Sequence, residues 1–164
     1  MLFLNCFFAA FVVGTVLLSI VTMFLKSTTI EQRIAIGVSL LALLSIIFLP
    51  IFDFLLGQFN GIMIIKSLFE HSIIGITDLL GSSEWIAIQI LLFASAISMA
   101  IACFYKKGGI IGGILMLCAF SWGLYKLSST DLRADVGMYM YALWAVIACF
   151  TPLLTSKMRF AEKE

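Results

Sequence analysis

The residues best suited to chemistry lie in the second quarter of the chain. Five charged or titratable side chains form what we term the polar cluster: Asp53, Lys66, Glu70, His71 and Asp78. His71 is the only histidine, and because an imidazole titrates near about pH 6.5, it is suited to sensing pH. A structural zinc site needs about four protein ligands and a catalytic one about three, which this cluster does not supply. We therefore expect a solvated polar surface with no metal.

Other reactive patterns are missing from the sequence. The glycine-rich segment contains neither GxxxxGK[ST] nor GxGxxG, so a phosphate-binding loop is not expected. The four cysteines form no CxxC pair and fall within apolar stretches, where they act as small packing residues. No catalytic residues, no cofactor and no enzymatic activity are predicted.

A second pattern consists of small residues, and their spacing is typical of helices that pack together and not of a reactive site. Four glycines open one apolar stretch: Gly108, Gly109, Gly112 and Gly113. Three small residues repeat every four positions in the preceding stretch: Ala94, Ser98 and Ala102. In lipid, small residues allow helix backbones to approach closely, so we expect these two helices to pack antiparallel across the short connection between them. An interface between subunits through the same glycines is the alternative.

The elements that carry these residues follow from composition. Of the 164 residues, 63% are hydrophobic and 12% charged, with a mean hydropathy of +1.17. Soluble domains are about 45–50% apolar and about 25% charged, so a water-soluble globule is excluded. The 19 charged residues avoid five stretches of 24, 19, 21, 18 and 21 residues: 2–25, 34–52, 85–105, 108–125 and 136–156.

These stretches predict a single all-α transmembrane domain. Isolated charges near a bilayer centre cost about 2.5–3.5 kcal/mol each, and about 20 apolar residues in a helix span the hydrocarbon core. We expect five transmembrane helices in a bundle, over residues 2–25, 34–56, 85–105, 108–126 and 136–156. Pro50 and Asp53 are expected to end the second helix, because proline lacks an N–H donor.

The long connection between the second and third helices has its own pattern. Apolar residues between Ile62 and Leu80 recur at spacings of three and four, which is typical of one helix face. We expect an amphipathic helix over about 60–81, with Asn60 as its N-cap and Gly81 at its end. It would lie along the outer membrane surface; a re-entrant hairpin is the alternative.

Lysine and arginine counts predict the orientation in the membrane. With the N-terminus outside, seven of the ten basic residues fall on the cytoplasmic side and three outside, as the positive-inside rule requires. We therefore expect the N-terminus outside and the C-terminus in the cytoplasm, by default in a bacterial cytoplasmic (inner) membrane. The short mixed-charge tail gives no reason to expect a nucleic-acid partner.

Three hypotheses about function remain open. The favoured one is a non-enzymatic assembly or accessory subunit that acts by helix packing, as a homo-oligomer or in a larger membrane complex of the secretion, conjugation, defence or toxin-immunity type. The alternative is an oligomeric channel or small transporter lined by hydroxyl side chains. These are Ser19, Thr22, Ser39, Ser45, Ser95, Ser98 and Ser121. The least favoured is a lipid-modifying enzyme that uses the acids and histidine of the polar cluster.

Overall fold

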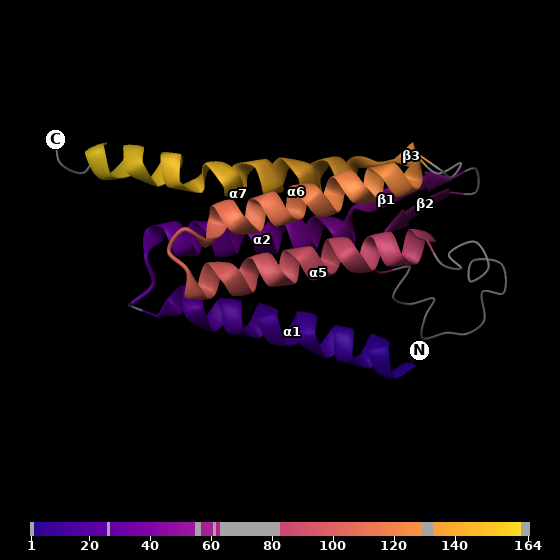
Figure 1. Cartoon of the computed structure of the whole chain (residues 1–164), viewed down its shortest axis with the longest axis horizontal. Coiled ribbons are helices and arrows are strands. Elements are labelled where there is room, and N and C mark those ends of the chain that lie inside the picture. Colours follow the sequence, from indigo (N-terminus) through magenta and orange to yellow (C-terminus); the bar gives the residue numbers. More distant parts are fainter. Residues whose placement is uncertain are drawn as a thin grey trace.

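The molecule is a bundle of long helices with a small sheet at one end (Figure 1). The computed structural model describes residues 2–25, 27–54, 57–60, 62, 83–128 and 133–161. Within these ranges the long helices are α1 (Leu2–Phe24), α2 (Ile30–Phe48), α5 (Ser83–Phe104), α6 (Gly108–Leu127) and α7 (Val136–Ala161). The strands are β1 (Pro50–Phe54), β2 (Gly57–Asn60) and β3 (Arg133–Ala134). The expected helical class is therefore confirmed.

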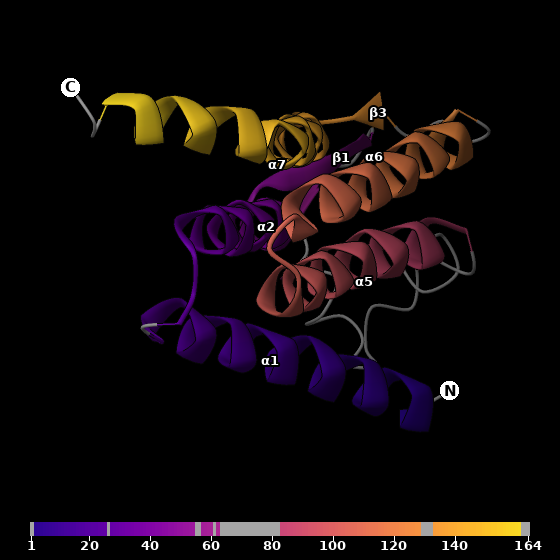
Figure 2. The same ribbon diagram turned by 60° about the vertical axis from the view of Figure 1, so that its left-hand side comes forward.

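Four of the helices surround a common core, and α1 lies outside it. Helix α5 packs against α6, α6 against α7, α7 against α2, and α2 against α5. Helix α1 packs mainly on α5 (Figure 2). Successive helices run in opposite directions, so the N- and C-terminal ends of the chain lie at opposite ends of the bundle (Figure 1).

Helices α2, α5, α6 and α7 are each long and apolar enough to cross a membrane, judged by length and composition. The qualifying parts of α5 and α7 are Ala87–Phe104 and Val136–Leu153, and α2 and α6 qualify over their full lengths. The apolar part of α1 with described side chains, Ala10–Phe24, is shorter than these four spans. These findings indicate an integral membrane protein with four candidate spans.

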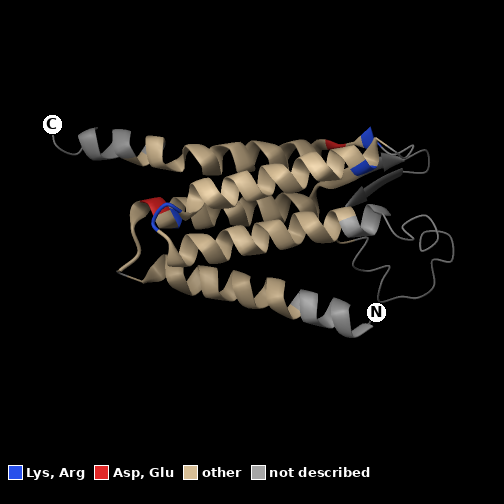
Figure 3. Ribbon diagram, in the orientation of Figure 1, with Lys and Arg blue, Asp and Glu red and all other residues tan. Residues whose placement is uncertain are grey.

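The described charges lie at the two ends of the bundle (Figure 3). Arg33, Lys106 and Lys107 occupy one end, and Lys126 and Arg133 occupy the end that carries the sheet. The helical surface between them carries exposed aliphatic and aromatic side chains. This separation is what a bilayer imposes, because charges are costly in its hydrocarbon core.

The second helix differs from its predicted bounds of 34–56. It begins at Ile30, because Thr29 caps it: the Thr29 side chain accepts a bond from the Gln32 N–H, and Gln32 Oε1 accepts one from the Thr29 N–H. It ends at Phe48, since Leu49 is extended (ψ 152°) before Pro50, as the residue before a proline usually is. Pro50 thus stops the helix, and Asp53 lies beyond it.

A small three-stranded sheet, which was not predicted, accompanies the helices. Strand β1 lies in the middle, with β2 and β3 antiparallel on either side. Asn60, predicted as a helix N-cap, instead lies in β2 opposite Pro50, because its strand pairs with the segment that leaves α2. The rest of the amphipathic segment predicted over about 60–81 lies outside the described residues, apart from Ile62.

The remaining helices lie close to their predicted bounds, with one extension. Helix α7 continues to Ala161 instead of ending near 156, and Pro152 lies inside it. Figure 2 shows the two parts of α7 running in different directions. A proline in a helix interior removes one backbone bond and bends the helix.

Candidate functional site

The four glycines at the start of α6 lie mainly against two different helices. Gly108 and Gly112 are directed at α5, whereas Gly113 is directed at α7 and Gly109 at α7 and also at Ala35 of α2. All four are buried. Since the two pairs are offset by one residue, about 100° around the helix, α6 fits between both neighbours with its backbone close to each.

The contact with α5 involves two of the three small residues predicted for it. A methyl group added at Gly112 would meet Ser98 Oγ and lie 2.9 Å from Ser98 Cβ. One added at Gly108 would lie 2.7 Å from the Ala102 Cα. Ala94, further along the same helix, is also buried. The structure thus brings the predicted glycines and small residues together within one chain.

The contact with α7 was not predicted from the sequence. A methyl group at Gly113 would lie 2.8 Å from both the Ala145 carbonyl oxygen and the Cys149 nitrogen, and one at Gly109 would lie 3.0 Å from the Ala148 carbonyl oxygen. Ala145 and Cys149 are small residues spaced by four. This spacing was the available signal, and it is the same signal that identified the face on α5.

A buried serine pair joins α2 to α5 beside this contact. The hydroxyl oxygens of Ser39 and Ser98 lie 2.8 Å apart and are hydrogen-bonded. Both residues are about 1% exposed. Because Ser98 also lies against Gly112, this one position links three helices.

A second polar contact joins α2 to α7. The Trp144 indole Nε1–H donates to Ser45 Oγ over 3.1 Å, and Ser45 Oγ donates to the Leu41 carbonyl over 2.8 Å. Tyr141, fully buried, donates its hydroxyl to the Leu91 carbonyl of α5 over 3.2 Å. Each polar group in these contacts therefore has a partner within the bundle.

The hydroxyls considered as a channel lining are all hydrogen-bonded inside the chain. Ser39 and Ser98 bond to each other, and the other five bond to carbonyl groups of their own helices. Five of the seven are buried: Ser19, Ser39, Ser45, Ser95 and Ser98. This arrangement is that of packing residues, in which the five hydroxyls bonded to carbonyl groups have already donated their hydrogens.

The bend in α7 places a freed carbonyl against a glycine. Proline has no N–H, so Pro152 cannot donate to the Ala148 carbonyl, and that oxygen faces Gly109. Thr151 donates to Ile147, and Thr155 donates to the carbonyls of Thr151 and Pro152. The absence of a side chain at Gly109 leaves room for this oxygen.

The polar cluster is only partly within the structure. Asp53 lies in β1, where its register partners are Gln58 of β2 and Arg133 of β3. Next to β3, Asp135 Oδ1 accepts the Val136 N–H over 2.6 Å at the start of α7. The other predicted members, Lys66, Glu70, His71 and Asp78, lie outside the described residues.

No residue that the structure describes covers the outer, apolar surface of α1. Val13, Leu17 and Val21 are each more than half exposed, and a methyl group at Gly14 would have no atom within 4 Å. The opposite side of α1 packs on α5, where the rings of Phe11 and Phe93 lie 5.0 Å apart. Helix α1 thus leaves a broad face, with a glycine in it, open to its surroundings.

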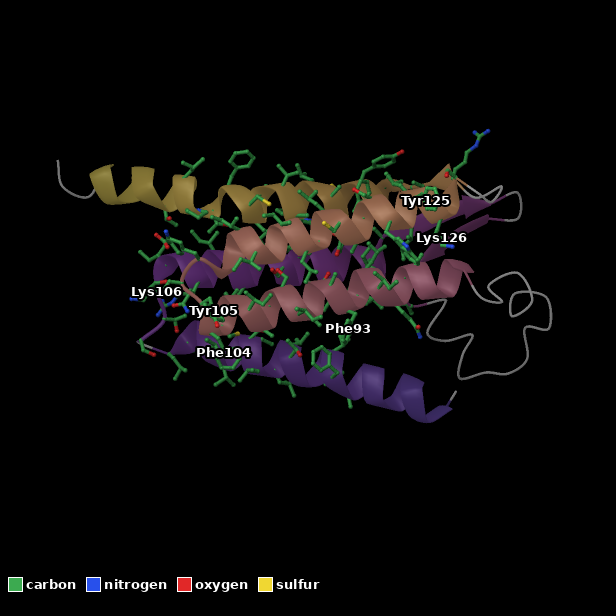
Figure 4. The ribbon with its side chains drawn as sticks, in the orientation of Figure 1. Phe93, Phe104, Tyr105, Lys106, Tyr125 and Lys126 are labelled. Atoms are coloured by element: carbon green, nitrogen blue, oxygen red, sulfur yellow. The ribbon has the colours of Figure 1, made fainter. Side chains whose placement is uncertain are left out.

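Aromatic side chains mark both ends of the bundle (Figure 4). Phe104 and Tyr105 are exposed at one end of α5, and Tyr125 is exposed at the opposite end of α6. The Lys126 ammonium lies 5.7 Å from the centre of the Trp122 ring. Aromatic residues in such positions are typical of the two membrane–water interfaces.

In the parts of the chain that the structure describes, no three histidine, cysteine or acidic side chains gather as metal ligands. The arrangement is suited to binding other helices and lipid. The sequence matches no protein-family model and no curated protein, and the structure matches no solved structure.

Proposed function

We propose that this protein crosses the membrane five times and is a non-enzymatic assembly or accessory subunit of a membrane complex. The observation that carries the proposal is the contrast between a tightly packed interior and the uncovered face of α1. The interior glycines of α6 are in contact with α5 and α7 of the same chain. Gly14 on α1 has open space before it, so a helix of another chain can approach there.

Helix α1 has the length of a fifth crossing. Its 23 residues extend about 35 Å at about 1.5 Å per residue, which exceeds a hydrocarbon core of about 30 Å. None of these residues is charged. Its packing on α5 further supports its position among the other spans.

The charge pattern supports an orientation with the N-terminus outside. In that orientation the end of the bundle with Arg33, Lys106 and Lys107 is cytoplasmic, and the sheet lies outside. The positive-inside rule favours this choice. In a cysteine-free background, a cysteine added at the N-terminus should react with an impermeant thiol reagent in intact cells, and one at the C-terminus should not. Reaction of only the C-terminal one would reverse the topology.

Helix α1 supplies the face through which we propose that the protein assembles. Ala10, Val13, Gly14, Leu17 and Val21 recur at the spacing of one helix face, and all five are exposed. In lipid there is little hydrophobic driving force between helices, because acyl chains are as apolar as the side chains. Helix association therefore depends on close packing at small residues. Gly14 is therefore the position at which a partner helix gains the most contact.

The proposal is tested by the mass of the assembly. The full chain would be purified in nanodiscs from the native membrane and its mass compared with 18.1 kDa. We expect a homo-oligomer or co-purifying subunits, reduced to the single chain by Gly14→Leu. The matched control is Ser121→Leu, a small exposed position on α6, which should leave the assembly intact. A single chain with nothing bound would contradict the proposal.

A further inference from the structure

A cavity opens at the end of the bundle where α1, α2 and α5 meet. Its volume is about 290 Å³, close to the lower end, about 300 Å³, of small-molecule sites. Eight residues line it: Leu18, Thr22, Leu25, Ser27, Thr28, Gln32, Cys103 and Phe104. They come from the last turns of α1 and α5, the first turn of α2 and the connection between α1 and α2. The cavity therefore lies at the level where the helices leave the membrane.

The walls of the cavity are held by bonds between different elements. Gln32 Nε2 donates to the Cys103 carbonyl over 3.3 Å, which ties α2 to α5. Thr28 Oγ1 lies 2.5 Å from the Thr22 carbonyl and ties the connection to α1. Ser19 Oγ lies 3.7 Å from the Cys103 Sγ, between α1 and α5. These bonds between α1, α2, α5 and the connection fix the positions of the cavity walls.

A cation lies at the edge of this cavity. Arg33 Nη2 donates to the carbonyl of Leu25, a lining residue, over 3.0 Å. A guanidinium has five N–H donors arranged in a fork that matches phosphate oxygens. Lys106 and Lys107 follow the lining residue Phe104 by two and three positions, and both are exposed. Figure 4 shows Lys106 at this end of the bundle.

The described cations at this end of the bundle favour the binding of an anionic ligand. Among the residues with described side chains, three cations, Arg33, Lys106 and Lys107, lie here with one acid, Glu31. Glu31 is in the first turn of α2, and neither it nor the three cations belongs to the lining of the cavity. Among these described side chains, the cations at this end of the bundle outnumber the acid by three to one.

The remaining walls favour an acyl chain. Leu18 and Leu25 are 44% and 49% exposed, and Phe104 is 73% exposed. These side chains lie where the cavity meets the apolar surface of the bundle. A ligand that fits both parts has a phosphate at one end and hydrocarbon at the other.

We propose that this cavity binds the phosphate headgroup of an anionic phospholipid, with an acyl chain along Leu18 and Phe104. The proposal rests on the membrane location and on the orientation inferred above, which puts the cavity in the cytoplasmic leaflet, where anionic lipids are abundant. Basic pockets between transmembrane helices on this side are known to take such headgroups. In this proposal the phosphate lies toward Arg33, which bonds to the lining residue Leu25, and toward the two lysines at the same end of the bundle.

The test counts retained lipids. The full chain would be placed in nanodiscs of equal parts phosphatidylglycerol and phosphatidylcholine, and lipids that remain bound would be identified by native mass spectrometry. We expect phosphatidylglycerol to be retained in preference. Arg33→Gln should lower this preference by about fivefold, the contribution of one basic residue near a charged membrane surface. Thr22→Phe, which fills the cavity, should abolish it.

Two matched controls separate the site from general effects. Ser121→Phe makes the same kind of change, because Ser121 and Thr22 each donate only to a carbonyl of their own helix. Lys126→Gln removes a cation at the opposite end of the bundle. Both variants should retain phosphatidylglycerol as the unmodified chain does, and a melting curve for each variant would show that it is folded.

Three results would overturn the proposal: equal retention of the two lipids, unchanged retention in folded Thr22→Phe, or displacement of the bound lipid by inorganic phosphate alone. The last result would identify a free phosphate site. Retention is counted per chain, so it does not depend on the assembly state. A single chain that retains phosphatidylglycerol would contradict the proposed assembly but not the lipid site. An assembled chain that retains both lipids equally would contradict the lipid site but not the assembly.

Discussion

Gly112 of α6 lies against Ser98 of α5 at the point where Ser98 bonds to Ser39 of α2. The two serine oxygens are 2.8 Å apart, and a methyl group at Gly112 would lie 2.9 Å from Ser98 Cβ. Ser98 therefore takes part in two contacts at once: it is hydrogen-bonded to Ser39, and the missing side chain of Gly112 lets α6 lie against it. The close approach of three helices depends on both.

A double-mutant cycle tests this relationship. Gly112→Ala should lower the free energy of unfolding by about 1–3 kcal/mol, the usual range for overpacking a core. The loss should be smaller in a Ser98→Gly background, because the two nearest atoms that the new methyl group meets, Oγ and Cβ, belong to the Ser98 side chain, and only the Ser98 Cα at 3.2 Å remains. Unfolding by SDS titration in mixed micelles would measure all four variants. Strict additivity would show that the two positions are independent.

The backbone contact at Gly113 predicts that Gly113→Ala lowers stability more than Gly112→Ala does. No second side-chain substitution should restore the loss. An added methyl group would lie 2.8 Å from the Ala145 oxygen and the Cys149 nitrogen, and these backbone atoms cannot rotate away. We expect Gly113→Ala to lower the unfolding midpoint by more than Gly112→Ala does. Gly37→Ala is the control, because its nearest neighbour is the Met23 Cε at 4.0 Å. Similar losses at Gly113 and Gly37 would rule out packing as the cause.

The Trp144–Ser45 hydrogen bond predicts a modest loss of stability. Ser45→Ala removes the acceptor of the indole N–H and should cost about 0.6–1.7 kcal/mol, the range for interhelical bonds in membranes. Ser121→Ala removes a hydroxyl that donates only to its own helix and should cost less than about 0.5 kcal/mol. The same SDS titration compares the two variants. An equal loss in both would mean that the bond between helices contributes nothing.

The positions of the helices were predictable from the sequence because the cost of a buried charge is large. Each isolated charge in a bilayer centre costs about 2.5–3.5 kcal/mol, so the charge-free stretches indicate where helices lie. Pro50 also indicated the end of α2, since the helix ends two residues before it. The exact start of α2 at Ile30 depended on a capping box at Thr29 that charge exclusion does not reveal.

The sheet and the α7 contact were harder to predict, for different reasons. Apart from Asp53, strand β1 is apolar, so it resembles a continuation of α2. Its pairing with β3 joins residues 53 and 133, which are distant in the chain. The spacing of Ala145 and Cys149 is present in the sequence, but small residues also occur on lipid-facing surfaces. The glycines of α6 indicated close packing without indicating which helix each one faces.

The register of the sheet can be tested by a disulfide between β1 and β3. Directly opposed residues of antiparallel strands have Cα atoms about 4.5–5.5 Å apart, which suits a disulfide, so Asp53→Cys with Arg133→Cys should cross-link in a cysteine-free background. Asp53→Cys with Ala134→Cys should not, because Ala134 is opposite Phe52 and neighbouring residues of a strand point to opposite faces. Labelling with a maleimide polymer, before and after reduction, counts the free thiols on a gel. Cross-linking of neither pair would favour the helix originally expected over 34–56, and equal cross-linking of both would show that the register is not fixed.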